Sequence, residues 1–405
     1  MSSRVHSFVA YLVVSIAAIM VFIAISQAAR SITAENTIVA PAQIASVSGP
    51  SIASSSSVAT TSAFVSVATS SKKVESPSKA TVLQNIDKKT KVPAPAPQST
   101  PASVQKSPIF EITRIKDPYP APPSSFDDVN VSTRGTLVNI LCMAPHGASV
   151  QPISGSGVII DPRGVILTNA HVAQYVLLSE SPRIDLVCSI RIGSPATPRW
   201  KAEVLYIPPV WVTAHVGEIN TSHPQGTGEH DYALLRITGS IDSSPALSSF
   251  PYLSFDTREV IGFLGDPVLG AAYPAEFVGG YSALNNLNVV SSVSTIDQLM
   301  TFDVNSVDMI SIGGVIEAQS GSSGGAVVNA WNKLIGIITT TSEGVTTAER
   351  KLHAITMSYV DRDIKTQTGQ YLDTYLQGDL AEKESTFNTE HGLDLIDQYI
   401  KMLER

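Results

Sequence analysis

The sequence carries little positive charge, and it lacks any grouping of residues that would hold a metal ion. Lysine and arginine total 27 against 35 acidic residues, giving a formal net charge of −8 at pH 7. This acidic balance argues against a nucleic-acid partner. The lysines between positions 72 and 91 have no aromatic residues among them, so we interpret them as solvated charges. Because no cluster of His, Cys or acidic residues has metal-ligand spacing, we expect no metal ion and no other cofactor.

The N-terminal region contains an apolar run without charge, Phe8–Ser26, between Arg4 and Arg30. As a helix its 19 residues, at about 1.5 Å each, nearly match a hydrocarbon core about 30 Å thick. We therefore expect residues 1–30 to be a single-pass membrane anchor. The small residues Ser26–Ala28 leave a cleaved signal peptide as the alternative. Under both interpretations the rest of the chain is extracytoplasmic, either tethered to the membrane or secreted.

Residues 31–125 are rich in Ser, Ala, Thr, Val and Pro, with runs such as SIASSSSVATTSAF and VPAPAPQSTPAS. Such a segment cannot bury enough apolar surface to offset the entropy of ordering it. Its Pro-Ala run favours an extended backbone. We predict a disordered linker between the anchor and a folded domain.

Between residues 126 and 364, short runs rich in Val, Ile and Thr are broken by Gly, Pro, Asp and Asn. Two successive sets of these runs predict an antiparallel all-β domain made of two barrels. The turn residues of Asp161–Gly164 separate two of the runs and predict a hairpin. In residues 365–405 apolar residues recur at helical spacing, which predicts a C-terminal helical tail.

The stretch GSSGGAVVN, residues 321–329, places two serines and three glycines directly before an apolar run. A surface turn would have this composition, and so would a nucleophile held on a sharp turn. The second interpretation needs a base and a carboxylate elsewhere. His171 ends a β run in GVILTNAHV, and Asp231 directly precedes another run in EHDYALLRI. Their order along the chain, His, Asp and Ser, each at the edge of a run, favours a catalytic triad.

These three motifs resemble those of chymotrypsin-fold serine proteases, and they are most similar to the HtrA type. The histidine motif of that family, Gly-Ser-Gly-hydrophobic-Ile followed by Leu-Thr-Asn-Ala-His-Val, is matched by residues 155–159 and 167–172. Its Asp-x-Ala-hydrophobic-Leu motif is matched by residues 231–235, and its Gly-x-Ser-Gly-Gly motif by residues 321–325. The resemblance covers residues 137–363 and implies two six-stranded antiparallel β-barrels.

The resemblance also implies a role for each residue. Ser323 would be the nucleophile, His171 the general base and acid, and Asp231 the group that fixes the imidazole tautomer. The N–H groups of Gly321 and Ser323 would form the oxyanion hole. Ser322 is the alternative nucleophile, but it does not stand in the register of the motif.

The sequence departs from the family at several positions. Ser322 replaces the aspartate with which pancreatic-type enzymes bind a newly cut N-terminus, so activation by that ion pair is not expected. The segment between Val172 and Asp231 is longer than the HtrA type leads us to expect, and it forms either a loop over the cleft or a surface insertion. About 42 residues follow Asp363, too few for the PDZ domain that HtrA-type proteases usually carry.

Two features bear on substrate recognition. Glu317 lies six positions before Ser323, where trypsin-like enzymes hold the carboxylate of the primary specificity pocket. Such a carboxylate would favour cleavage after Lys or Arg, whereas an exposed glutamate would have no such role. The run Ile337–Glu343 resembles the strand whose edge pairs with the substrate backbone.

The two cysteines, Cys142 and Cys188, lie in β runs of the first barrel, and neither has the glycine setting of a nucleophile. In the family fold these runs would be neighbouring strands where the barrel closes. Exported proteins meet oxidising conditions, so a disulfide is one expectation and a pair of buried thiols is the other.

The leading hypothesis is a membrane-tethered serine endopeptidase that acts on exported proteins or peptides. The alternative is a catalytically inactive, protease-like module that binds peptides at the cell surface. A binding module has no need of His, Asp and Ser together, so the intact set favours the enzyme. The oligomeric state and the physiological substrate do not follow from these residues.

Overall fold

The computed structural model describes residues 114–115, 117–145, 148–221, 226–242, 245, 247–275, 284–302, 305–313, 320–341 and 351–404. The predicted anchor at residues 1–30 and the predicted linker up to residue 113 lie outside the described residues. Within the described part of the chain, no helix is both long enough and apolar enough to cross a membrane.

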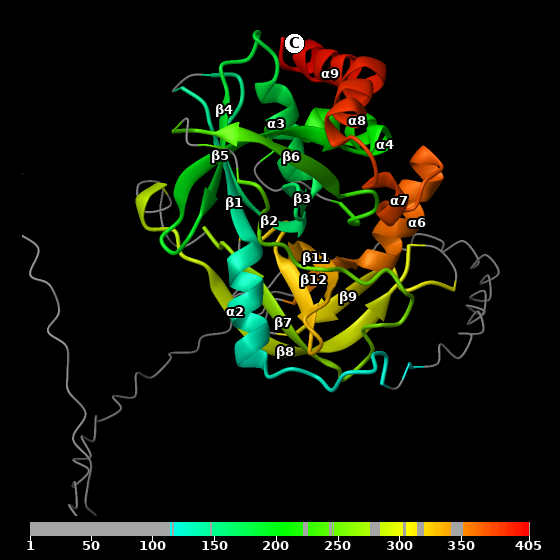
Figure 1. Cartoon of the computed structure of the whole chain (residues 1–405). Helices are drawn as coiled ribbons and strands as arrows, with labels where there is room; N and C mark the ends of the chain where they lie inside the picture. Colours follow the sequence, from blue (N-terminus) through cyan, green and yellow to red (C-terminus); the bar gives the residue numbers. More distant parts are fainter. Residues whose placement is uncertain are drawn as a thin grey trace, which may run out of the picture. The chain divides into compact units, whose positions relative to one another are not determined.

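Two closed six-stranded antiparallel β-barrels form the fold, as predicted, with the first barrel above the second in Figure 1. The first barrel has the strand order β1-β2-β3-β6-β5-β4, with β1 (Leu137–Met143), β2 (Ile153–Asp161), β3 (Val165–Thr168), β4 (Val187–Ile192), β5 (Thr197–Tyr206) and β6 (Ala233–Ser240). The second barrel has the order β10-β11-β12-β9-β8-β7, with β7 (Pro267–Ala272), β8 (Val290–Met300), β9 (Met309–Ile312), β10 (Ala326–Asn329), β11 (Leu334–Thr341) and β12 (Leu352–Thr356).

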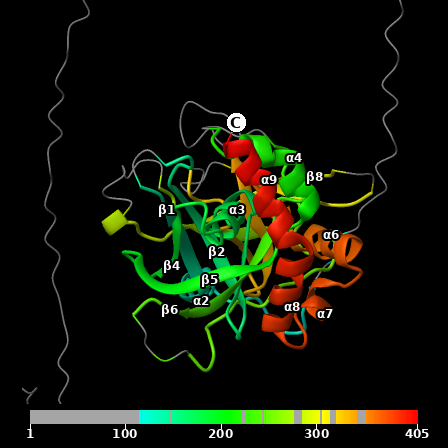
Figure 2. The ribbon, with the colours of Figure 1, turned by 90° about the horizontal axis from the view of Figure 1, so that it is seen from above.

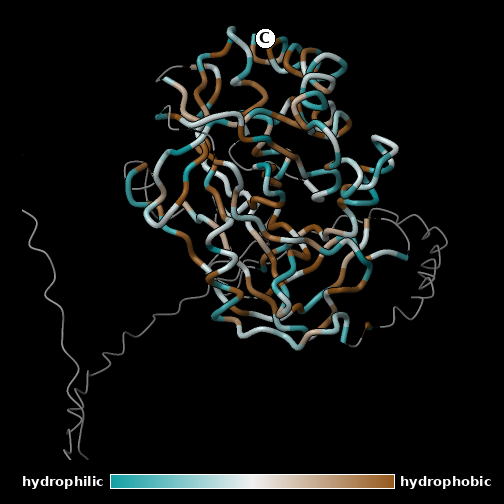
Figure 3. The backbone as a smooth tube through the Cα atoms, in the orientation of Figure 1, coloured by the Kyte–Doolittle hydropathy of each residue, from teal (hydrophilic) through white to brown (hydrophobic). Residues whose placement is uncertain are grey.

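Local chemistry explains the hairpin between β2 and β3. Asp161 pairs with Val165 across the turn, and the N–H of Gly164 donates to the carbonyl of Asp161 at 3.0 Å. Gly164 has φ +86°, a left-handed conformation that costs glycine nothing. The apolar residues of the two strands that leave this turn are buried. Figure 3 shows hydrophobic segments, in brown, along the strands of both barrels. The hairpin predicted at Asp161–Gly164 is confirmed.

Helices cover the first barrel and one side of the second. Their bounds are α2 (Phe126–Thr136), α3 (Ala170–Ser179), α4 (Pro209–His215), the 3₁₀ turn η1 (Val216–Glu218), α6 (Met357–Thr368), α7 (Leu372–Tyr375), α8 (Leu380–Phe387), the π turn η2 (Asn388–Gly392) and α9 (Leu393–Leu403). Helix α6 starts inside the segment assigned to the barrels and continues past residue 364, so barrel and tail are continuous. The side chains of α8 and α9 join the hydrophobic core of the first barrel.

The long segment between Val172 and Asp231 supplies β4, β5 and a helical surface layer. Helix α4 and the turn η1 pack against α9, and α4 also contacts α3. Figure 2 shows α4 beside the red C-terminal helix α9. The described part of this segment therefore completes the first barrel and supports the C-terminal helix.

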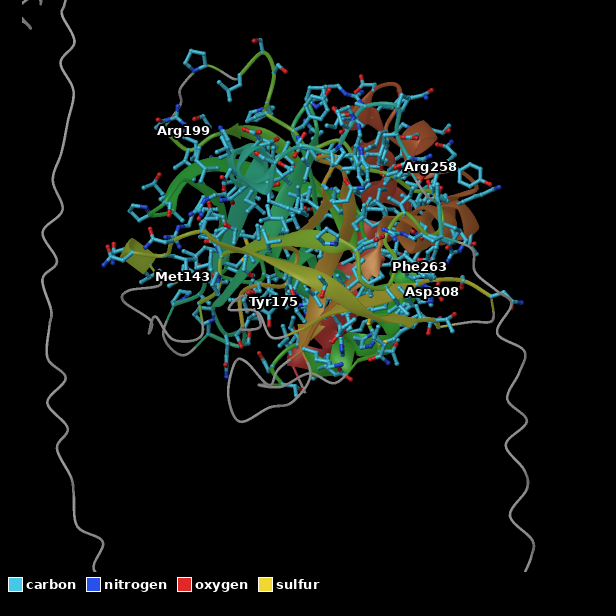
Figure 4. The ribbon with its side chains drawn as sticks, turned by 90° about the horizontal axis from the view of Figure 1, so that it is seen from below. Met143, Tyr175, Arg199, Arg258, Phe263 and Asp308 are labelled. Atoms are coloured by element: carbon cyan, nitrogen blue, oxygen red, sulfur yellow. A yellow bond between two sulfur atoms is a disulfide. The ribbon has the colours of Figure 1, made fainter. Side chains whose placement is uncertain are left out.

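The end of the predicted linker packs on the second barrel. The hydroxyl of Tyr119 donates to Asp256 at 2.6 Å, and its ring lies 5.4 Å from that of Trp331. The guanidinium of Arg258, labelled in Figure 4 with Phe263 and Asp308, lies over the same tyrosine ring. Aromatic and cation–π contacts therefore order residues 117–125, although their Pro-rich composition is typical of a linker.

A disulfide joins Cys142 of β1 to Cys188 of β4. The two residues face each other in the register of the adjacent strands, with Cα atoms 4.0 Å apart. The bond therefore lies where β1 and β4 close the first barrel.

Candidate active site

His171 and Asp231 come together because β3 and β6 are neighbours. His171 is the second residue of α3, directly after β3, and Asp231 lies two residues before β6. In the ladder between these strands Thr168 pairs with Ala233. The register brings the end of β3 beside the start of β6, so both side chains leave the barrel at one place.

Three hydrogen bonds fix the two residues relative to each other. Nδ1 of His171 lies 2.7 Å from Oδ2 of Asp231, and the backbone N–H of His171 donates to Oδ1 at 3.0 Å. The Asn169 amide donates to the backbone carbonyl of Asp231 at 2.8 Å. The Asp231 side chain is only 7% exposed, whereas that of His171 is 26% exposed. The carboxylate is buried, and the imidazole retains access to solvent.

Burial and charge oppose each other in this pair. Burial disfavours the ionised carboxylate of Asp231, but the charge and hydrogen bonds of His171 outweigh it and lower the pKa of Asp231. Burial also disfavours the His171 cation, yet the Asp231 carboxylate outweighs it and raises the pKa of His171. An ionised Asp231 accepts the Nδ1–H of His171, so Nε2 of the neutral ring carries no proton. The ring is then poised to accept a proton at Nε2.

Ser323 lies in a tight loop, residues 320–325, directly before β10. Gly321 and Gly324 have φ +93° and +85°, which disfavour any residue with a Cβ. A Cβ added to Gly321 would lie 2.9 Å from the carbonyl oxygen of Tyr273, and one added to Gly324 would overlap that of Ser156. The loop therefore needs glycine at both positions, for conformation and for close approach.

A serine of the first barrel ties this loop to the histidine side of the site. The N–H of Ser156, in β2, donates to the carbonyl of Ser323 at 2.8 Å, and its hydroxyl donates to that of Gly321 at 2.8 Å. The same hydroxyl accepts from the N–H of Tyr273 at 2.9 Å. Ser156 thus holds the loop of Ser323, which belongs to the second barrel, against the first barrel.

Thr339 of β11 links Ser323 to the His–Asp pair. Its hydroxyl donates to Oδ2 of Asp231 at 2.7 Å, and its carbonyl accepts from the Ser323 hydroxyl at 3.4 Å. Within the described residues no hydrogen bond joins the Ser323 hydroxyl to the His171 ring. Catalytic hydrogen bonds in substrate-free enzymes are often long and tighten when substrate binds.

The two neighbouring serines differ in accessibility. Ser322 is 1% exposed, and its hydroxyl has no hydrogen-bond partner within the described residues. Ser323 is partly exposed. A substrate carbonyl can approach only an accessible oxygen, so the geometry favours Ser323 as the nucleophile.

The N–H groups of Gly321 and Ser323 donate no hydrogen bond within the described residues. These are the two groups that the sequence motif predicts for an oxyanion hole. Glu317, the candidate for a specificity pocket, lies outside the described residues. No group of three or more potential metal ligands occurs in the part of the chain that the structure describes.

Sequence reasoning missed two residues of the site. Thr339 falls in the run IITTTSE, which we interpreted only as an edge for substrate. Ser156 falls in the Gly-Ser-Gly motif before the histidine, where its contact with the nucleophile loop has no local signal. Both contacts join residues that are more than 100 positions apart and belong to different barrels, so only the folded chain reveals them.

Comparison with protein families shows what this chain is similar to. Residues 155–337 match the family model described as a trypsin-like peptidase domain, a range that includes His171, Asp231 and Ser323. A search among curated proteins finds no similar sequence.

Proposed function

Because this chain contains a trypsin-like peptidase domain with the chymotrypsin fold, we propose that it is a serine endopeptidase using Ser323, His171 and Asp231. The observation that carries the proposal is the 2.7 Å contact between Nδ1 of His171 and the buried carboxylate of Asp231. This contact prepares Nε2 to accept a proton. The partly exposed Ser323 lies on a loop tied to the same site through Thr339 and Ser156.

In the proposed mechanism the Ser323 oxygen attacks the scissile carbonyl carbon, and its proton passes to Nε2 of His171. The N–H groups of Gly321 and Ser323 stabilise the tetrahedral oxyanion. The imidazolium then gives its proton to the leaving amine as the C–N bond breaks, and the acyl group remains on Ser323 as an ester. Water, deprotonated by His171, hydrolyses this ester, releasing the carboxylic acid and restoring the hydroxyl.

We further propose that the substrates are exported proteins or peptides and that residues 1–30 tether the enzyme to a membrane. The apolar run Phe8–Ser26 supports the tether, and a cleaved signal peptide would instead release a secreted enzyme. The alternative function, a catalytically inactive peptide-binding module, is less well supported. Such a module gains nothing from a buried carboxylate that orients an imidazole.

A fluorophosphonate probe tests the proposal, because it reacts with an activated serine and needs no knowledge of the substrate. We expect the wild-type protein to be labelled at Ser323 and the Ser323→Ala variant to take no label. Ser322→Ala is the matched control, since it removes a buried neighbouring hydroxyl, and it should be labelled like the wild type. A folded wild-type protein that takes no label would favour the binding module.

A further inference from the structure

His230, the residue directly before Asp231, has an unusual backbone conformation. Its φ is +59°, in the left-handed region that residues with a Cβ occupy infrequently. Such a conformation costs free energy and persists only where surrounding contacts hold it. The next N–H, that of Asp231, donates to Gly228 at 3.2 Å, so the turn at His230 sets the direction in which Asp231 leaves the loop.

Helix α6 supplies the contacts that hold His230. Nδ1 of the imidazole lies 2.9 Å from Oδ1 of Asp363, whose side chain is only 7% exposed. The backbone N–H of His230 donates to the hydroxyl of Tyr359 at 2.9 Å. Side chain and backbone of His230 are thus both bound by one face of α6, one turn apart on the helix. The hydrogen bond with Asp363, opposed by burial, raises the pKa of His230. The positive charge of the imidazolium, which strengthens this hydrogen bond, therefore persists to a higher pH than in an ordinary histidine.

Helix α6 is itself fixed to the second barrel. The hydroxyl of Thr356 caps its first turn by accepting from the N–H of Tyr359, and the same hydroxyl donates to the carbonyl of Val307 at 2.7 Å. Arg362 forms an ion pair with Asp308, which lies at the start of β9. Two adjacent residues of α6 thus have different partners. Arg362 binds the second barrel, and Asp363 binds the loop that carries Asp231.

We propose that His230, Tyr359 and Asp363 form a clamp through which α6 positions Asp231. The proposal rests on the proposed function, because it assigns these residues to the geometry of the proposed triad. His230 and Asp363 are positioning residues and do not touch the reacting atoms. The clamp matters because Asp231 orients His171 through one carboxylate, and a displacement of about 1 Å in such a site can cost a hundredfold in rate.

The test separates the backbone requirement from the imidazole contact. His230→Gly tolerates the left-handed conformation but removes the contact with Asp363. His230→Asn should keep both the left-handed conformation and the hydrogen bond to Asp363. Asparagine also accepts this conformation, and its Nδ2 can occupy the position of Nδ1 of histidine. We expect His230→Gly and Asp363→Ala to lower kcat roughly ten- to a hundredfold with little change in KM, and His230→Asn to restore most of it. Tyr359→Phe removes one hydroxyl only and should lower kcat less.

Glu384→Gln is the matched control. It weakens the ion pair with Arg236, 2.6 Å long, that joins α8 to β6, so it also loosens a C-terminal helix from the first barrel. Within the described residues, Glu384 forms no hydrogen bond and no ion pair with the loop 228–231. We expect this variant to unfold at a lower temperature and to keep the wild-type kcat.

The kinetic parameters are measured with a peptide substrate selected from a library, after fluorophosphonate titration of active sites in every variant. A wild-type protein that takes no label overturns the proposed function and the clamp together. A reactive wild type with undiminished kcat in His230→Gly and Asp363→Ala overturns the clamp alone. Equal losses of kcat in Glu384→Gln and the clamp variants also overturn it, because general loosening would then explain the effect.

Discussion

The ionisation of His171 depends on one carboxylate that the fold has taken out of water. Burial alone would leave the ring neutral, but Asp231 at 2.7 Å reverses the balance and raises the pKa of His171. The buried carboxylate in turn accepts three hydrogen bonds, from two groups of His171 and from Thr339. A group so fully bonded holds the ring in one orientation, as a general base requires.

The pH dependence of the reaction should report this balance. The proposed base acts only when neutral, so kcat/KM should rise with pH through the pKa of His171, above the ordinary value of a histidine. Asp231→Asn removes the charge that raises this pKa, so we expect the rise to shift to lower pH and kcat to fall by about 10⁴. Rates measured with the library-selected peptide from about pH 5 to 9 check both effects. An unchanged profile in Asp231→Asn would contradict the assignment.

Strand ends and strand pairing decide which side chains meet. His171 lies shortly after the end of β3, Asp231 lies two residues before β6, and Ser323 lies in the loop before β10. None of these elements is near another in sequence. The ladder between β3 and β6 brings His171 to Asp231, and the contacts of Ser156 and Thr339 between the two barrels bring in the loop of Ser323. Where the first barrel closes, β1 and β4 carry a covalent bond in addition to the ladder.

Removal of that bond should weaken the first barrel. The disulfide joins residues 46 apart, and it restricts the unfolded chain more than the folded one. We expect the double variant Cys142→Ser, Cys188→Ser to lose about 2–4 kcal/mol of unfolding free energy. Urea unfolding of the variant, compared with the oxidised and the reduced wild type, measures this loss. If oxidised wild type and variant unfold at the same urea concentration, the bond contributes no stability.

The C-terminal helices and the first barrel share one hydrophobic core, and a partly buried acid lies where they meet. Glu180, just after α3, accepts from the N–H of Val204 in β5 at 2.9 Å and from the amide of Asn388 in η2 at 3.3 Å. Burial raises the pKa of Glu180 to about 7. Two hydrogen bonds do not offset the loss of water, so this carboxyl resists ionisation at physiological pH.

The stability of the whole domain should therefore fall as the pH rises. In the unfolded chain Glu180 titrates near 4.5, so its favourable contribution is complete below that pH and is lost as the pH rises through about 7. The loss of unfolding free energy should be on the order of 3 kcal/mol, because one pKa unit corresponds to about 1.4 kcal/mol. Glu180→Gln cannot ionise, and we expect its thermal unfolding temperature to fall less than that of the wild type from about pH 5 to 8. Parallel curves for the two proteins would show that folded Glu180 is already ionised across this range, so that its pKa is not raised.

The strands, the turns and the three motifs can be predicted from the amino-acid sequence alone. Val- and Ile-rich runs between turn residues indicate strands, and the Asp161–Gly164 turn needs only its own residues. Glycines at 321 and 324 already indicate a strained loop around Ser323, because few other residues adopt that backbone. Signals of this kind depend only on a few neighbouring residues, so they can be recognised without knowledge of the tertiary structure.

The distant residues that support these motifs are known only from the folded structure. It joins Thr339 to Asp231, Ser156 to the nucleophile loop and Cys142 to Cys188. It also shows that α6 continues across the expected domain boundary and binds His230. Each of these contacts depends on barrel closure and helix packing, and no short stretch of sequence encodes the partner at the other end.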